Sequence, residues 1–523
     1  MKPDDSLSKD GPHVLSWNVA IVALTMAGAL YVLSRTVADP DLWGHVLFGV
    51  DMIRARSIPA TDPYSYLTFD HPWINHELLS ELALGLSFDW GGTPGLMLLK
   101  LVVTLPIVAL VYRHLVRHGL DLLPAGVVVL LILFPMVPGL ATIRPHLFTY
   151  LFFALTLLII DRAERGQLAF LWALPVLSAV WVNFHGGVLA GLGIYVLWAS
   201  GTVVYSWIFP ERAGPVAIGR LVAVGVLSLA ALTVNPYLWR LPLFLFETAT
   251  IPRPEISEWR PLDLMSAEGV VFLLVVLLGG VVIVRTRRKR RVGPLFTLAC
   301  VTLLPLLSLR HLPLFALTFA VFLAEHIADT WAQLASSINA PPGGKRSSRR
   351  HRAILTGVTF FVAIVLAASS IPSFACIPVK QRRSKGYPTR AIALLSESGV
   401  AGNLAIHFDY GEYAIWHLRD RVFVSMDGRR ETVYPDSVYS EALRFQQGVG
   451  AWDDVLDKRP TDMALVKTSS ASFNLMKLKP GWELVHEDAL VGLFARQAWP
   501  GAEQLRSSPA RPRAANGENA CFP

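Results

Sequence analysis

Two carboxylates stand two residues apart in the segment Asp39-Pro40-Asp41-Leu42-Trp43-Gly44-His45. Either one could deprotonate a hydroxyl group as a general base, or bind a metal ion or a substrate. The same residues suit the start of a helix, with Asp39 as the cap, Pro40 at the first position and Asp41 in the first turn. Taken alone, the motif favours capping over catalysis. Asp41 and His45 are also four residues apart, a spacing that permits metal binding but is common by chance.

A second polar motif, His71-Pro72-Trp73-Ile74-Asn75-His76-Glu77, follows in the same loop. His76 and Glu77 stand at the start of a predicted helix, where they could either cap the helix or line a pocket. Trp43 and His45 of the first motif could face the same pocket. The sequence leaves structural and binding roles open for all four residues.

Basic and amide residues recur at the ends of later apolar runs, in Arg144-Pro145-His146, Asn183-Phe184-His185-Gly186-Gly187 and Arg310-His311. A side chain that reaches for the membrane interface explains each basic residue taken singly. Together they would suit an anionic lipid headgroup, because Arg binds phosphate in a bidentate fork.

Lys100 lies inside an apolar run, roughly 12 Å from its start at the helical rise per residue. An intramembrane lysine is energetically expensive and indicates a functional role. A side chain that extends outward to the interface explains Lys100 equally well. The sequence does not decide between these two interpretations.

The composition of the chain indicates that these motifs belong to a membrane protein. Of its 523 residues, 53% are hydrophobic and 16% are charged, and the mean hydropathy is +0.46. A bilayer is crossed by about 20 apolar residues. Apolar runs predict about eleven spans, near Leu15–Leu33, Gly92–Tyr112, Leu122–Leu140, Leu147–Ile160, Leu168–Val182, Val188–Phe209, Leu221–Val234, Leu264–Val284, Gly293–Leu309, Leu312–Ala328 and Ile354–Ile371.

The loops between these runs predict the orientation of the chain. Basic residues gather in every second loop, as Arg113 and Arg117, Arg162 and Arg165, Arg212 and Arg220, Arg285 to Arg291, and Lys345 to Arg352. Such loops are typically cytoplasmic, so residues 1–14 are predicted to be a cytoplasmic N-terminus and the polar motifs to lie on the outer side. The net charge of +8 therefore does not indicate a nucleic-acid partner.

Two domains are predicted from these patterns. Residues 15–371 form a transmembrane helical domain, which includes a long first outer loop over residues 35–91. That loop carries two amphipathic stretches at the membrane interface, Trp43 to Ile53 and Leu78 to Leu86.

A small α/β domain on the outer side is predicted for residues 372–496. Strands are expected at Leu404–Phe408, Val422–Ser425 and Met463–Val466, and helices at Ala391–Glu397 and Ser437–Phe445. The tail, residues 497–523, is predicted to be disordered. Cys376 and Cys521 fall on the same oxidising side, but the disorder expected of the tail argues against a disulfide between them.

This order of features resembles the GT-C superfamily of polyprenyl-phosphate-sugar-dependent glycosyltransferases, and more narrowly a large group of bacterial membrane proteins with little assigned function. The chain departs from that group at Gly44, where relatives tend to have an aromatic residue, and it lacks the Trp-Trp-Asp motif of oligosaccharyltransferases. The likeness covers nearly the whole chain. It is carried by the two first-loop motifs, Asp62-Pro63-Tyr64-Ser65-Tyr66, Arg144-Pro145-His146-Leu147-Phe148-Thr149, Asn183-Phe184-His185-Gly186-Gly187, Arg310-His311-Leu312-Pro313-Leu314, Tyr410-Gly411-Glu412-Tyr413-Ala414-Ile415-Trp416 and Asp427-Gly428-Arg429.

The resemblance implies an inverting glycosyltransferase of the bacterial inner membrane. Its partners would be membrane lipids and a polyprenyl-phosphate-linked sugar, and a divalent cation could take part. Asp39 or Asp41 would be the general base. The predicted donor-phosphate residues are Lys100, Arg144, His146, Arg310 and His311; the predicted acceptor or pocket residues are Trp43, His45, His76, Glu77, Asn183 and His185.

Two alternatives from other classes remain. A transporter or flippase for a lipid-linked saccharide would explain Lys100 in mid-span, but charge deep in the other spans is sparse and no repeat is evident. A non-catalytic envelope assembly protein would use the outer domain, including Tyr410–Trp416, to bind partners.

Overall fold

The computed structural model describes residues 12–213, 216–249, 251, 253, 256–338, 349–379, 386–508 and 520–523. The chain divides into two compact units. Unit 1 takes its described residues from Met1–Arg35, Met97–Ala141 and Pro145–Phe374. Unit 2 takes its described residues from Thr36–Leu96, Thr142–Arg144 and Ala375–Pro523. Each unit therefore joins segments that are far apart in the sequence.

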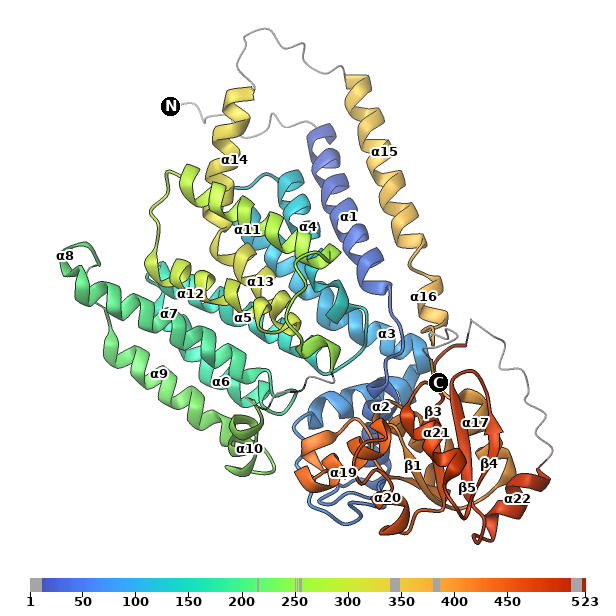
Figure 1. The fold of residues 1–523 in the computed structure, drawn as a ribbon. Helices are drawn as coiled ribbons and strands as arrows, with labels where there is room; N and C mark the ends of the chain where they lie inside the picture. Colours follow the sequence, from blue (N-terminus) through green and yellow to red (C-terminus); the bar gives the residue numbers. More distant parts are fainter. Residues whose placement is uncertain are drawn as a thin grey trace, which may run out of the picture. The chain divides into compact units, whose positions relative to one another are not determined.

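Unit 1 is helical throughout its described residues (Figure 1). Short 3-10 helices interrupt it at η1 (Leu168–Trp172), η2 (Ala231–Thr233), η3 (Ser257–Trp259), η4 (Leu304–Leu306) and η5 (Leu309–His311). Its helices are α1 (Pro12–Ser34), the later part of α3 (Leu78–Arg117), α4 (Leu122–Leu140), α5 (His146–Glu164), α6 (Ala173–Trp181), α7 (Val188–Ile208), α8 (Pro210–Ala213), α9 (Ile218–Ala230), α10 (Arg240–Thr248), α11 (Ala267–Arg285), α12 (Val292–Leu303), α13 (Leu312–Phe322), α14 (Ala324–Ile338), α15 (Arg349–Ala368) and α16 (Pro372–Ala375).

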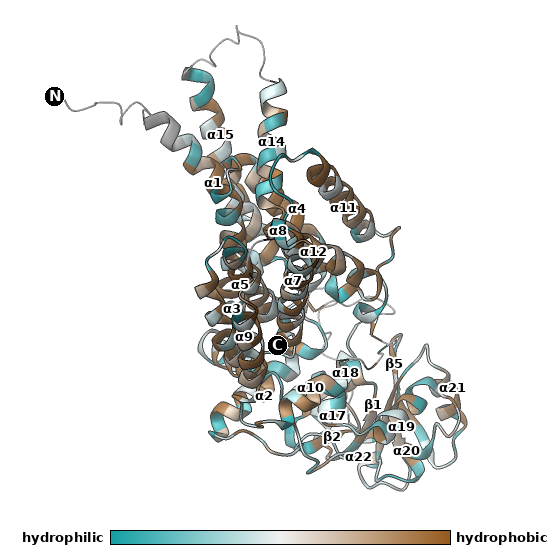
Figure 2. Cartoon of the chain, turned by 90° about the vertical axis from the view of Figure 1, so that its left-hand side faces the viewer, coloured by the Kyte–Doolittle hydropathy of each residue, from teal (hydrophilic) through white to brown (hydrophobic). Residues whose placement is uncertain are grey.

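Seven helices of the described residues are long and apolar enough to cross a membrane, or eight if the bent pair Leu309–Phe322 and Ala324–Ser337 is one span. The chain is therefore a multi-pass membrane protein, and Figure 2 shows hydrophobic residues along most of α5, α7 and α11. Three further apolar helices, Leu168–Trp181, Ile218–Thr233 and Val292–Leu306, are shorter. They coincide with three of the eleven predicted spans, so that count is not confirmed.

Small residues let α1 pack closely against α4. Gly126 faces the Thr25 hydroxyl, which would lie 2.4 Å from a Cβ atom at that position. Gly28 faces Leu130 across the same contact. Association of helices in lipid depends on such close packing, because lipid tails are as apolar as the side chains they would replace. α1 also packs along α15, the last long helix before unit 2 resumes.

The C-terminal part of unit 2 contains a five-stranded sheet in the order β2-β1-β3-β5-β4. β1 (Gly402–Ile406) pairs in parallel with β2 (Val422–Val424) and β3 (Met463–Lys467), while β5 (Val491–Arg496) runs antiparallel to β3 and to β4 (Trp482–Glu487). The helices of this part are α17 (Thr389–Ser398), α18 (Phe408–Leu418), α19 (Asp436–Gln447), α20 (Asp454–Asp457), α21 (Ala471–Leu478) and α22 (Gly501–Ser507).

The predicted α/β class of this part is thus confirmed, with corrections of detail. Three strands and two helices lie where the sequence predicted them. Phe408 begins α18 instead of ending a strand. β4 and β5 were not predicted, although they complete the sheet.

The first loop folds with this sheet, and not with the helical domain to which the sequence analysis assigned it. The backbone N–H of Tyr66 donates to the carbonyl of Val424 over 3.1 Å, and the N–H of Val424 donates to the carbonyl of Tyr64 over 3.3 Å. The loop helix α2 (Asp41–Ala55) packs on α18. The first loop and the C-terminal segment are therefore one structural unit.

The two amphipathic stretches of the loop are helical as predicted, and they cross at two glycines. A Cβ at Gly49 would lie 1.9 Å from the carbonyl oxygen of Glu81, and one at Gly85 would lie 2.5 Å from the Gly49 backbone. The start of α3 turns its polar side inward, with Ser80 and Glu81 buried and Leu86 61% exposed. At Gly92, a φ of 56° kinks the helix and redirects the chain into the long apolar part of α3.

The tail corrects two predictions. Cys376 and Cys521 form a disulfide, and residues 501–507 form α22. The backbone N–H of Phe522 donates to the carbonyl of Ile377, and the Phe522 side chain is buried against Trp43. The last residues are thus anchored in unit 2; residues 509–519 lie outside the described part of the chain.

Candidate active site

Asp39, Asp41 and Arg144 form an ion-pair cluster in unit 2. The Arg144 Nε atom lies 3.1 Å from Asp39 Oδ2, and its Nη2 atom donates to Asp41 Oδ2. A helix does start here, with Asp41 in its first turn as predicted, but α2 begins one residue later than predicted, and its cap residue is Pro40, which makes no side-chain cap hydrogen bond. The two carboxylates are therefore directed at a guanidinium, and the structure does not favour the capping role that the motif suggested.

Glu412 of α18 adds a third carboxyl group to this cluster. The backbone N–H of Gly44 donates to Glu412 Oε2 over 3.1 Å, across 368 residues of sequence. A Cβ at Gly44 would lie 2.2 Å from this carboxyl group. A Cβ at Gly428 would lie 2.7 Å from Asp41 Oδ1 and 2.8 Å from Glu412 Oε1. Both glycines are needed because the acids approach the backbone too closely for any side chain.

The Glu412 carboxyl group is poised to hold a proton. Its side chain is buried, and burial raises its pKa well above the usual range. The nearby charges of Asp41, Asp427 and Asp39 raise the pKa further, while Arg429 opposes them. A neutral carboxylic acid at Glu412 can donate a hydrogen bond, which a carboxylate could not do.

Arg429 supports the cluster from within the core of unit 2. Its Nη2 atom donates to Asp62 over 2.8 Å and to Asp427 over 2.6 Å, and its Nε atom also bonds Asp427. The guanidinium carbon lies 5.0, 5.1 and 4.8 Å from the ring centres of Phe48, Tyr64 and Trp73. A charge that is buried this deeply is tolerated only because it is paired and surrounded by aromatic faces. Arg429 thereby ties the first loop to the segment that carries Gly428.

A second group in unit 2 has the composition of a metal site. Ligand atoms of His45, Glu77 and Glu81 lie within 4.8 Å of one another. His45 Nδ1 is 3.3 Å from Glu81 Oε1, and Asn75 donates to the other oxygen of Glu81 over 2.5 Å. Burial by itself lowers the pKa of His45, but the carboxylates of Glu77, Glu81 and Asp41 outweigh it and raise the pKa to about 9. One imidazole and two carboxylates fit a divalent cation.

Trp43 and His76, two other predicted pocket residues, have packing and ion-pair partners in unit 2. Trp43 is fully buried, with its ring 4.6 Å from Tyr387, 5.1 Å from Tyr413 and 5.3 Å from Phe522. His76 Nε2 lies 3.7 Å from Glu77 Oε1. Trp43 therefore contributes to an aromatic core that holds the start of α2 in place, and His76 lies at the edge of the possible metal group.

The remaining predicted site residues belong to unit 1. Lys100 is 1% exposed within α3. His146 Nε2 donates to the carbonyl of Gly139 over 2.7 Å. Asn183 donates to the carbonyls of Ala179 and Val234. His146 and Asn183 therefore make hydrogen bonds that fix the backbone at helix ends.

His185 is likewise engaged by its neighbours. Its Nδ1 atom accepts from the backbone N–H of Gly187 over 2.9 Å and lies 2.9 Å from the Thr149 hydroxyl. Trp181 donates to the same hydroxyl over 3.1 Å. This turn joins α6 to α7, and the hydrogen bonds of His185 stabilise its conformation.

Arg310 lies in a group of cations that the sequence analysis did not assemble. Its guanidinium is 4.2 Å from the centre of the Trp259 ring, and that of Arg253 is also 4.2 Å from it. The N–H of Leu309 donates to the carbonyl of Arg260 over 2.8 Å. His311 follows directly, before α13. Two guanidinium groups around one indole ring make this the most cationic of the predicted donor-side positions in unit 1.

The main residues that sequence reasoning missed are Glu412 and Arg429. Both stood in strings that carried the family resemblance, but neither was assigned a role. The available signal was the presence of glycine at positions 44 and 428. An unexpected glycine often marks a place where another group comes close to the backbone. What approaches Gly44 could not be deduced from its neighbours in the sequence.

The fold resembles those of solved membrane glycosyltransferases. An oligosaccharyltransferase of Archaeoglobus fulgidus in the apo form matches with a TM-score of 0.58 and 12% identity, over 88% of this chain and 70% of that one. The AglB oligosaccharyltransferase of the same organism, in complex with an inhibitory peptide and a dolichol-phosphate, matches with 0.58 and 10% identity, over 86% and 69%. ArnT from Cupriavidus metallidurans in the apo state matches with 0.50 and 13% identity, over 92% and 98%.

No protein-family model and no curated protein sequence matches this chain. The structural neighbours belong to the GT-C glycosyltransferase superfamily, so the predicted GT-C fold is confirmed. At these identities the likeness concerns the fold.

Proposed function

We propose that the chain is a membrane glycosyltransferase that moves a sugar from a polyprenyl-phosphate donor to an envelope acceptor on the outer face of the membrane. The observation that carries the proposal is the convergence of Asp39, Asp41, Arg144 and Glu412 in one cluster. Support also comes from the GT-C fold and from the AglB complex, which contains a dolichol-phosphate.

Asp41 is the better of the two candidate bases. Its side chain is 22% exposed against 11% for Asp39, so a substrate hydroxyl can reach it more easily. Arg144 pairs with both carboxylates and holds them in place; a general base acts in its ionised form. Glu412, whose pKa is raised by burial, can donate a hydrogen bond to Asp41 and so orient it. In this mechanism Arg144 positions the base and does not bind the donor phosphate.

Unit 1 by itself offers a cationic group that would suit a donor phosphate. Arg253 and Arg310 at Trp259 offer the paired guanidinium groups that stabilise a leaving phosphate. Lys100, His146 and His311 are the weaker candidates for this role. A divalent cation, if one takes part, would be held by His45, Glu77 and Glu81 and would supply positive charge to the site.

The outer location is supported by the disulfide between Cys376 and Cys521. Disulfides form and persist in the periplasm and outside the cell, and rarely in the cytosol. Unit 2 therefore belongs on the oxidising side, in agreement with the alternation of basic loops. We assign the chain to the bacterial inner membrane with its N-terminus in the cytoplasm.

The test is mass spectrometry of envelope lipids and glycans from a deletion strain complemented with variants. The wild-type chain should restore a sugar that is missing from the deletion strain, and Asp41→Asn should restore less by about 10²–10⁴-fold, the usual contribution of a general base. Asp51→Asn is the matched control, because Asp51 lies on the same helix but pairs with Arg419 and Tyr64.

Two results would overturn the proposal. Full restoration by both Asp39→Asn and Asp41→Asn would remove the carboxylates from the mechanism. Movement of a lipid-linked sugar across liposomes containing the purified chain, without any covalent product, would favour the flippase alternative. With purified enzyme, loss of a base lowers kcat with little change in KM, whereas a damaged binding site raises KM.

A further inference from the structure

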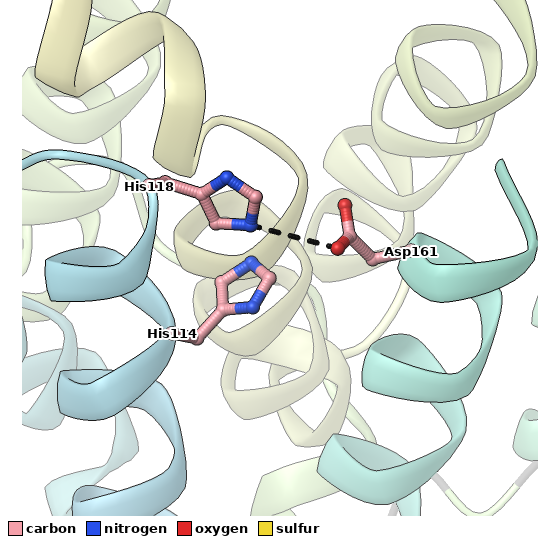
Figure 3. A group of neighbouring side chains, drawn as sticks. All are labelled: His114, His118 and Asp161. Atoms are coloured by element: carbon pink, nitrogen blue, oxygen red, sulfur yellow. Dashed lines mark ion pairs between the residues drawn. The ribbon is translucent and has the colours of Figure 1, made fainter. Parts of the chain in front are cut away.

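Unit 1 contains a cluster of metal-ligating side chains that the proposed glycosyl transfer does not use. His114 and His118 lie four residues apart on α3, so they share one helical face. Asp161 of α5 faces them, as Figure 3 shows. Ligand atoms of the three residues lie within 4.8 Å of one another. His114 and Asp161 are buried, and His118 is half-buried.

Along α5 the cluster lies far from the start of the helix. Asp161 is in the last turn of this 19-residue helix, and Arg144 precedes its first turn. A helix of that length is about 28 Å long, close to the thickness of the hydrocarbon core. The cluster therefore lies at the other end of the span from the start of α5.

The spacing of the three ligands suits a tetrahedral ion. Two ligands about 2.1 Å from zinc at the tetrahedral angle are about 3.4 Å apart. His118 Nε2 lies 3.6 Å from Asp161 Oδ2, which is close to that separation. His114 is in contact with His118, with 4.4 Å between their ring centres. Small side-chain rotations would bring all three ligand atoms to bonding distance.

The surroundings of the cluster resemble those of protein metal sites, where second partners orient each ligand. His114 Nε2 donates to the carbonyl of Val321 over 3.0 Å, which leaves the other ring nitrogen with its lone pair. Asp161 accepts from Arg165 Nε at 3.2 and 3.1 Å, so its orientation is fixed. Imidazoles held by carbonyls and carboxylates held by donors are the usual arrangement.

The local charge also favours a cation. Arg165 pairs with Glu325 over 3.0 Å as well as with Asp161, and Arg291 Nε lies 3.7 Å from Glu325. Glu164 accepts from Trp198 Nε1 over 2.8 Å nearby. Within this network the three carboxylates exceed the two guanidinium groups in formal charge.

We propose that His114, His118 and Asp161 bind a divalent transition-metal ion, Zn²⁺ in the first place, which links α3 to α5 at this end of the bundle. Two imidazoles and one carboxylate are the three protein ligands of known four-coordinate zinc sites, in which water takes the fourth position. In this proposal the ion joins α3 and α5 and takes no part in the proposed transfer reaction, because the cluster includes no residue of that reaction.

The test uses the full chain in detergent, stripped of metal, with Co²⁺ as a spectroscopic probe of low coordination number. All variants also carry His45→Gln, so that the group of His45, Glu77 and Glu81 lacks one ligand and does not compete for the metal. We expect one equivalent of Co²⁺ with a visible absorption band, displaced by one equivalent of Zn²⁺, and a melting temperature that rises with Zn²⁺. His118→Gln and Asp161→Asn should each weaken binding by more than about 100-fold, since even loss of an outer partner weakens metal binding by about 10–100-fold.

His326→Gln is the matched control, because His326 is a buried histidine of unit 1 that contacts Thr286 and is not part of the cluster. It should leave the cobalt spectrum unchanged. Absence of a cobalt band in the His45→Gln background would refute the proposal, as would a band that survives both ligand substitutions. The first measurement leaves all three ligands intact, so a variant that fails to fold does not remove the test.

Discussion

Unit 2 and unit 1 each bury a cluster of ionisable side chains, and the two clusters are assembled differently. In unit 2, Asp41 meets Arg144 across 103 residues of sequence, and Gly44 meets Glu412 across 368. In unit 1, His114 and His118 share one helix and lie opposite Asp161 and Arg165 of another. The first cluster depends on glycines where any Cβ would collide, whereas the second uses side chains at ordinary helical spacing.

This difference indicates different roles. The unit 2 cluster holds a carboxyl group whose pKa is raised by burial and by three further carboxylates, which is an unstable arrangement that a purely structural site would avoid. The unit 1 cluster satisfies its acids with nearby guanidinium groups. We expect substitutions in unit 2 to disturb both folding and activity, and those in unit 1 to act mainly on stability and metal binding.

The largest effect is expected from Arg429→Met. Removal of one partner of a buried ion pair leaves Asp62 and Asp427 as uncompensated buried charges, which destabilises a protein by about 3–5 kcal/mol. Arg165→Met in unit 1 is the comparison variant, and it should cost less because the Arg165 side chain is 29% exposed. Chemical unfolding of both variants in detergent measures the difference, and equal losses would contradict the contrast between the clusters.

The disulfide is expected to matter next. Replacing Cys376 and Cys521 together by Ser should destabilise unit 2 by about 2–5 kcal/mol, the usual effect of losing a native bridge. Limited proteolysis should then cut the tail, because Phe522 loses its anchor against Trp43. The reduced wild-type chain should behave alike. A tail that stays protected in the double variant would show that the aromatic packing is sufficient without the bridge.

A smaller effect is expected from Gly44→Ala. The new methyl group would lie 2.2 Å from the Glu412 carboxyl group, and such overpacking costs about 1–3 kcal/mol. Activity should fall as well, because Glu412 must shift away from Asp41. The control is Gly193→Ala in α7, where a Cβ meets nothing within 4 Å and alanine should stabilise the helix by about 0.5–1 kcal/mol. Unchanged activity in Gly44→Ala would separate Glu412 from the reaction.

The smallest effect is expected from Glu412→Gln, which should change how the stability of the chain depends on pH. The pKa of Glu412 is higher in the folded chain than in the unfolded chain, so the folded chain keeps this proton to a higher pH. Stability therefore falls as the pH rises above the usual carboxyl range. The groups that face it are Asp41, Asp427, Asp39 and Arg429. Glutamine keeps the acceptor for Gly44 N–H and removes the titration. Melting curves against pH should therefore be flatter for the variant, with a gain at high pH.

Much of the fold was accessible from the sequence, and the candidate site much less so. Apolar runs located the spanning helices, because lipid allows only long apolar segments that satisfy their own backbone hydrogen bonds. The motif at Asp39 and Asp41 was recognised in the sequence. The predicted side-chain cap is not observed, because the cap residue is Pro40 and makes no side-chain hydrogen bond. Arg144 was predicted to bind the donor phosphate, and its pairing with both acids was not predicted.

The sequence by itself therefore determined that the chain is a multi-pass membrane protein, the GT-C pattern of a polar first loop and an α/β segment after the last span, and the two acids near the start of that loop, of which Asp41 begins α2. Only the tertiary structure decided which groups face those acids. Glu412 and Arg429 reach the first loop from the far end of the chain, and the disulfide joins Cys376 to Cys521 across 145 residues of sequence. Contacts of this kind form when distant segments pack together, and such packing leaves no periodic or local pattern in the sequence. The partners of the two acids could therefore be identified only in the folded structure of unit 2.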